Sequence, residues 1–125
     1  MSDVKANPFD DLVGLDVATV TFVRDYVQIG FDGPLLTCFF PPRIVLPTEG
    51  AFAFGKAGYA DALVEFINCK LCIGVVIPRK EIKLTFEAGY GLSIDLNPDT
   101  APPGPESAML KLEDGRWWVW RPTDK

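Results

Sequence analysis

The chain has 125 residues, of which 48% are hydrophobic and 23% are charged, and its formal net charge at pH 7 is −5. This length and composition are typical of one packed domain and exclude a disordered chain. Its lysines and arginines are few and scattered, so the sequence argues against binding to nucleic acid.

The distribution of apolar residues indicates in which cellular compartment the protein is expected. The amino-terminal segment is polar and acidic, unlike a signal peptide. The longest apolar stretch, residues 71–77, is far shorter than the ~20 residues that span a bilayer. We therefore expect a single cytoplasmic domain, residues 1–125, that does not contact a membrane.

The first predicted unit covers residues 7–42. Asn7 followed by Pro8 predicts the start of a short helix, and Gly14 predicts its end. Three strands follow, predicted from β-branched residues, alternation and an Asp32-Gly33 turn: 16–23, 27–31 and 35–40. Residues 43–58 contain several prolines and glycines and are predicted to be a connecting loop that packs on the domain.

The second predicted unit covers residues 59–98. Apolar residues spaced three and four apart from Tyr59 to Asn68 predict an amphipathic helix. Three strands follow: 71–77, 82–86 and 92–96. The last two alternate cleanly between apolar and polar side chains, which favours a half-solvated antiparallel hairpin.

The two units align with each other. The alternating apolar residues of 27–31 match those of 82–86 at a constant offset of 55 residues. A proline-rich loop, residues 97–105, precedes a final hairpin at 108–121. The predicted fold is therefore α+β: a mainly antiparallel sheet from two repeated helix–three-strand meander units plus a C-terminal β-hairpin. Chance similarity between two amphipathic hairpins is the alternative explanation.

The sequence also restricts the possible chemistry. It contains no histidine and no glycine-rich phosphate-binding motif, so histidine-dependent catalysis and those nucleotide sites are excluded. Cys69 and Cys72 form a C-x-x-C pair, but it follows a helix and enters a strand, the reverse of a redox motif. We expect buried, inert thiols; a metal shared between chains or redox chemistry is the alternative. No catalytic residue, cofactor or metal site is predicted.

Two segments contain aromatic and arginine residues that the alternating strands do not account for. They are the 43–54 stretch and the tail Arg116–Arg121, which contains three tryptophans. Aromatic residues and arginine are favoured anchors in protein interfaces, although the same residues can simply fill a core. The candidate partner-binding residues are Arg43, Phe52, Phe54, Trp118, Trp120 and Arg121.

Several short patterns resemble a small bacterial family known only as a domain of unknown function: Leu12-Val13-Gly14, residues 20–27, Phe31-Asp32-Gly33 and Trp117-Trp118-Val119-Trp120. This resemblance implies no catalytic residues. In size, acidity and predicted α+β character the chain is also similar to bacterial immunity proteins, which neutralise toxins. We therefore expect a non-enzymatic protein that binds another protein, with toxin neutralisation as one form of that role. The alternatives are a small-molecule binder or carboxylate-dependent enzyme, and a structural homodimer.

Overall fold

The computed structural model describes residues 7–24, 26–101 and 106–121. Within these residues the chain forms ten strands, one α-helix and two short 3-10 helices: η1 (Pro8–Leu12), β1 (Val17–Val23), β2 (Tyr26–Phe31), β3 (Leu35–Cys38), β4 (Arg43–Leu46), β5 (Gly50–Phe52), α1 (Tyr59–Val64), β6 (Leu71–Ile77), β7 (Glu81–Phe86), η2 (Glu87–Gly89), β8 (Gly91–Asp95), β9 (Ala108–Lys111) and β10 (Trp117–Trp120).

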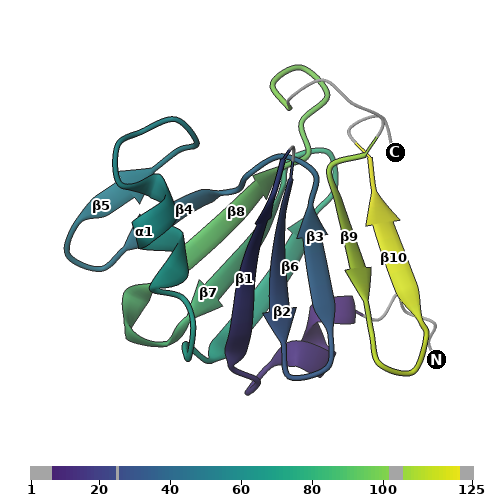
Figure 1. Cartoon of the computed structure of the whole chain (residues 1–125). Coiled ribbons are helices and arrows are strands. Elements are labelled where there is room, and N and C mark those ends of the chain that lie inside the picture. Colours follow the sequence, from purple (N-terminus) through teal and green to yellow (C-terminus); the bar gives the residue numbers. More distant parts are fainter. Residues whose placement is uncertain (1–6, 25, 102–105, 122–125) are drawn as a thin grey trace.

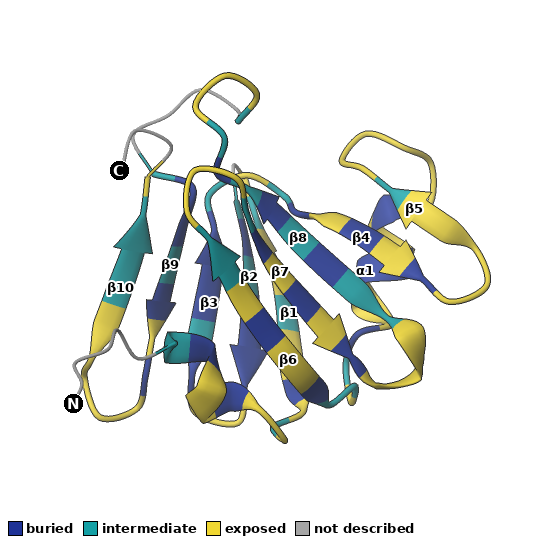
Figure 2. Ribbon diagram, turned by 180° about the vertical axis from the view of Figure 1, so that it is seen from behind, coloured by how far each residue is buried: buried dark blue, intermediate teal, exposed yellow. Residues whose placement is uncertain are grey.

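The strands form two five-stranded sheets that lie face to face (Figure 1). One sheet has the order β1-β2-β3-β9-β10 and the other β5-β4-β8-β7-β6, and every pairing of neighbouring strands is antiparallel. Along β7 alternate side chains point into the space between the sheets, and Figure 2 shows them as alternating buried and exposed bands. The stacked rings of Phe31 and Phe86, 6.4 Å apart, join the two inner faces.

The α+β prediction is wrong, because the fold is an antiparallel β-sandwich with little helix. The predicted helix at 59–68 is helical only to Val64, since the chain turns after Glu65 and Asn68 takes a left-handed φ of 77°. The prediction of two helix–three-strand units with an added C-terminal hairpin is also wrong. Residues 43–52 are a hairpin within the second sheet, where β4 pairs with β8, and not a connecting loop.

The two sheets nevertheless have the same internal register. Each consists of a three-stranded meander (β1-β2-β3 or β6-β7-β8) extended by a hairpin from the other half of the chain. Ile29 of β2 pairs with Leu36 of β3, just as Leu84 of β7 pairs with Leu92 of β8. The hairpin residue opposite Leu36 is Leu110, and the one opposite Leu92 is Ile44. Positions in one sheet therefore have structural equivalents in the other.

The same equivalence extends to the segments that precede β1 and β6. The Gly14 N–H donates to the Leu71 carbonyl, and the Asn68 N–H donates to the Val17 carbonyl. Both Gly14 and Asn68 have positive φ. A register shift follows Val17 in one sheet and Leu71 in the other. Each half of the chain therefore supplies a three-stranded meander to one sheet and a hairpin to the other.

Candidate functional site

A cleft of about 630 Å³ lies beside the connection from β3 to β4, which leads the chain from the first sheet to the second. It is bounded by that connection, the residues after β5, the start of β7, the end of β8 and the chain before β9. Its lining residues are Phe39, Phe40, Pro41, Pro42, Arg43, Ala53, Phe54, Lys80, Glu81, Ser93, Ile94, Asp95, Asn97, Thr100, Glu106 and Ser107.

One wall of the cleft is aromatic. Phe40 is 44% exposed and Phe54 is 58% exposed, and their rings meet edge to face with centroids 5.6 Å apart. Phe54 makes a second edge-to-face contact, at 5.9 Å, with the buried Tyr59. The Tyr59 hydroxyl donates to the Pro42 carbonyl and so fixes the connecting segment. Burial raises the pKa of Tyr59, so this donor keeps its proton well above neutral pH.

Other lining residues of the cleft are polar and are partly fixed by hydrogen bonds among themselves. Asp95 accepts from the Thr100 hydroxyl at 2.8 Å and from the Asn97 backbone N–H at 2.8 Å. Glu106 pairs with Arg121 at 3.7 Å. The carboxylates of Asp95 and Glu106 therefore already have hydrogen-bond or ion-pair partners within the protein.

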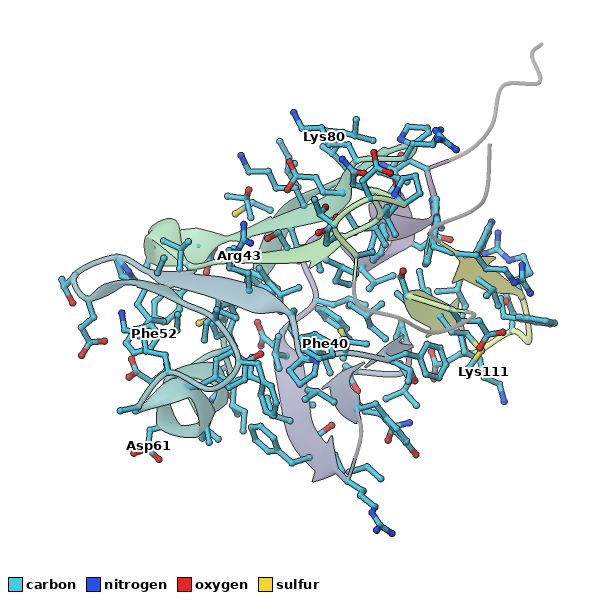
Figure 3. All side chains as sticks on the ribbon, turned by 90° about the horizontal axis from the view of Figure 1, so that it is seen from above. Phe40, Arg43, Phe52, Asp61, Lys80 and Lys111 are labelled. Atoms are coloured by element: carbon cyan, nitrogen blue, oxygen red, sulfur yellow. The ribbon has the colours of Figure 1, made fainter. Side chains whose placement is uncertain are left out.

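Three charged side chains in the cleft have no such partner. Among the described residues, the side chains of Arg43, Lys80 and Glu81 make no ion pair or hydrogen bond. Figure 3 looks down on this end of the molecule, and in that view Arg43 lies between Lys80 and Phe40. The cleft therefore presents exposed aromatic rings next to two cations and one carboxylate that make no such contact, within a lining of two cations and three carboxylates.

The structure separates the six candidate residues into two groups. Arg43 and Phe54 line the cleft, and Arg121 lies at its rim through its contact with Glu106. Phe52, Trp118 and Trp120 instead pack against the core. Trp120 stacks on Phe9 at 5.5 Å, and Lys56 lies 4.5 Å from the centre of the Phe52 ring.

Sequence reasoning missed several residues of the cleft, notably Phe40, Glu81 and Asp95. Phe40 did leave a signal, because Pro41 and Pro42 lack a backbone N–H and so place this aromatic residue at the end of the predicted strand 35–40. Glu81 and Asp95 were interpreted only as the polar side of a hairpin, which is where they lie. The tail tryptophan that is open to solvent is Trp117, 60% exposed, and it was not among the candidates.

The three cysteines are free and differ in burial. Cys38 is buried, Cys69 is half-buried and Cys72 is exposed, so the expectation of buried thiols is wrong for Cys72, which lies on an outward position of β6. Burial raises the pKa of Cys38 to about 12. The pKa of Cys69 is also raised, first by burial and then by the charges of Glu87, Asp16 and Glu65. Neither residue is an activated thiol, because an activated thiol has a lowered pKa.

The chain was compared with known proteins at three levels. No protein-family model, no curated protein and no solved structure matches it. The resemblance to a bacterial family of unknown function therefore stays a prediction, and Asp25 of its 20–27 pattern lies outside the described residues. No helix among the described residues is long and apolar enough to cross a membrane.

Proposed function

We propose that this protein is a non-enzymatic module that binds another protein through the cleft, with toxin neutralisation as one form of that role. The observation that carries the proposal is the exposed Phe40–Phe54 pair in the same cleft as Arg43, whose side chain makes no ion pair or hydrogen bond with another described residue. Aromatic residues and arginine are enriched at the centres of protein interfaces, and exposed aromatic clusters mark interaction sites. The proposed location remains the cytoplasm.

The internal equivalence of the sheets supports this choice of surface. Glu81 pairs with Asp95, and the positions that correspond to them in the other sheet are Tyr26, the first residue of β2, and Phe39, the residue directly after β3. The rings of Tyr26 and Phe39 contact each other at 6.2 Å. One pair therefore consists of two aromatic side chains in contact and the other of two carboxylates, and Phe39, Glu81 and Asp95 all line the cleft.

Affinity capture with the full chain tests the proposal. The tagged protein would be expressed in its native host and compared with the variant Phe54→Asp, which places a carboxylate on the aromatic wall. We expect the unmodified chain to recover one protein in stoichiometric amount and the variant to recover at least tenfold less. Circular dichroism would establish that the variant is folded.

A matched control comes from Phe22, which is 45% exposed on β1 and does not line the cleft. Phe22→Asp makes the same chemical change elsewhere and should leave capture unchanged. The proposal fails if the unmodified chain recovers no stoichiometric partner and does not self-associate. It also fails if Phe54→Asp and Phe22→Asp behave alike.

Small-molecule binding is the second candidate function. It is favoured by the cleft volume, which falls in the range of roughly 300–1,000 Å³ common for ligand sites. The carboxylate-dependent enzyme has less support, because the buried polar side chains among the described residues are those of Thr37 and Ser107, not carboxylates. A thermal-shift screen of metabolites would separate the two candidates: a ligand whose stabilisation is lost in Phe54→Asp would favour the small-molecule binder.

A further inference from the structure

Three polar side chains lie in one row across the outer face of the second sheet. Lys83 of β7 pairs with Ser93 of β8, and Ser93 pairs with Arg43 of β4. Their neighbours along the strands, such as Leu84, Leu92 and Ile44, are buried between the sheets, so these three side chains point outward. Directly opposed residues have Cβ atoms about 5 Å apart, which places the three groups within reach of one small ligand.

This row borders a second hollow and continues into the cleft. A trough of about 120 Å³ is lined by all three residues and by Gly91, which has no side chain to fill it. Arg43, Ser93 and the carboxylate-bearing Glu81 line both the trough and the cleft, so the two hollows are adjacent. Among the described residues, none of the three side chains makes a hydrogen bond or an ion pair.

The equivalent row of the first sheet is built differently. It consists of Gln28, Thr37 and Met109, which pair in the same register. The Gln28 amide donates to the Thr37 hydroxyl at 3.3 Å, and Thr37 is 3% exposed. That row is uncharged and internally bonded, so the fold does not require two cations at these positions.

The charges of the row formed by Lys83, Ser93 and Arg43 indicate which kind of ligand it could bind. Arg43 and Lys83 lie on either side of a hydroxyl in a chain whose net charge is −5, yet neither has a carboxylate partner among the described residues. A guanidinium group, a hydroxyl group and an ammonium group can all donate to one oxyanion. Phe40 and Phe54 lie at the cleft end of the same surface and would contact an apolar group attached to that oxyanion.

We propose that Arg43, Ser93 and Lys83 bind a carboxylate from an acidic segment of the partner protein, with an adjacent aromatic or aliphatic side chain of that segment on Phe40 and Phe54. This inference rests on the proposed function, because it names the chemistry of the partner at the same cleft. The shared chemistry is that of an oxyanion, which a phosphate could also supply, so the test compares the two.

The test is a titration of the full ¹⁵N-labelled chain, followed by the amide chemical shifts. Phenylacetate supplies a carboxylate and an aromatic ring, inorganic phosphate supplies an oxyanion alone, and benzylamine supplies the ring with the opposite charge. We expect phenylacetate to shift the amides of Ser93 and its neighbours in a saturable way, phosphate to do so more weakly, and benzylamine to leave them unmoved.

The variants take their replacement residues from the equivalent row of the first sheet. Arg43→Met and Lys83→Gln copy Met109 and Gln28, so both side chains suit an outward strand position. Each should weaken phenylacetate binding about tenfold, as expected for the loss of one charge-assisted hydrogen bond. Lys111→Gln removes an exposed cation from the other sheet, where Figure 3 shows it well away from Arg43, and should change nothing.

Four outcomes would overturn the inference. They are no saturable shift near Ser93, equal binding by the double variant Arg43→Met/Lys83→Gln, binding of phosphate in preference to phenylacetate, and undiminished partner capture by that double variant. If Phe54→Asp abolishes partner capture while the double variant does not, only the oxyanion site fails. If phenylacetate binds as expected but no protein partner is captured, the proposed protein-binding function fails.

Discussion

Gly74 allows η1 to pack directly on β6, so the substitution Gly74→Ala tests the packing of the sandwich. A Cβ at position 74 would lie 2.5 Å from Cβ of Phe9 and 3.0 Å from Cδ2 of Leu84. Phe9 is fully buried and stacks on Trp120, and the Asn7 amide donates to the Gly74 carbonyl at 2.6 Å. The added methyl group must therefore displace η1 from its position between β6 and β10.

The expected cost follows from this contact. Overpacking a core costs about 1–3 kcal/mol, and replacing glycine by alanine returns about 0.4–1 kcal/mol through the unfolded state. We expect a net loss of about 1–2 kcal/mol in the free energy of unfolding. Urea unfolding monitored by tryptophan fluorescence measures it and also reports any change around Trp120.

Gly91→Ala is the matched control, because a Cβ there would meet only ordinary contacts, at 3.8 Å and 3.9 Å. Both glycines lie in strands of the same sheet. Gly91→Ala should be neutral or slightly stabilising. The packing argument is refuted if Gly74→Ala is as stable as the unmodified chain, or if the two substitutions cost the same.

Three other predictions follow from burial and backbone geometry. Trp120→Ala should lower the free energy of unfolding, measured by chemical denaturation, by about 2–4 kcal/mol, because Trp120 stacks on Phe9. Trp117 is exposed, so Trp117→Ala should change the free energy of unfolding by no more than about 0.5 kcal/mol. Equal costs would contradict the assignment of Trp120 to the core. Folding raises the pKa of the Cys38 thiol from 9.0 to about 12, so the unfolded chain loses this proton at lower pH than the folded chain. The free energy of unfolding should therefore fall by roughly 1.4 kcal/mol per pH unit above pH 9. Urea titrations at pH 9–11 measure this slope, which Cys38→Ala should make shallower. Ala88→Gly should raise the melting temperature measured by circular dichroism, because Ala88 has a φ of 65°; an unchanged or lower value would argue against strain there.

The strands were the most predictable feature, because a two-residue period is visible in the sequence. Ile82, Leu84 and Phe86 alternate with polar residues, and all three are buried. The α1 region was less predictable: Phe66 continues the helical spacing but lies beyond the helix, because spacing alone does not show where a chain leaves a helix to pack in a core.

The missed hairpin shows a different limit of the sequence. β4 and β5 are only four and three residues long and lie among prolines and glycines, which favour a loop when only local residues are considered. They become strands because Ile44 and Leu46 complete the core beside β8. This pairing joins residues far apart in the chain, and a single sequence contains no local signal for it.

The candidate site was predictable only in part for the same reason. Arg43 and Phe54 were identified because an arginine and aromatic residues in a supposed loop had no structural explanation. Glu81 and Asp95 pair across the β7–β8 hairpin, and the connection from β3 to β4 places Phe40 in the same cleft. In one sheet Lys83, Ser93 and Arg43 form a row whose side chains make no hydrogen bonds among the described residues, and in the other Gln28 is hydrogen-bonded to Thr37. This contrast depends on the strand register and became visible only in the structure.

Photo-crosslinking at position 54 tests the central claim, that the cleft is the binding surface, most directly. A benzoylphenylalanine residue would replace Phe54 in one sample and Phe22 in another, and both would be irradiated in the native host. We predict one discrete protein adduct from position 54 and none from position 22. Adducts of the same protein from both positions, or from position 22 alone, would contradict the claim.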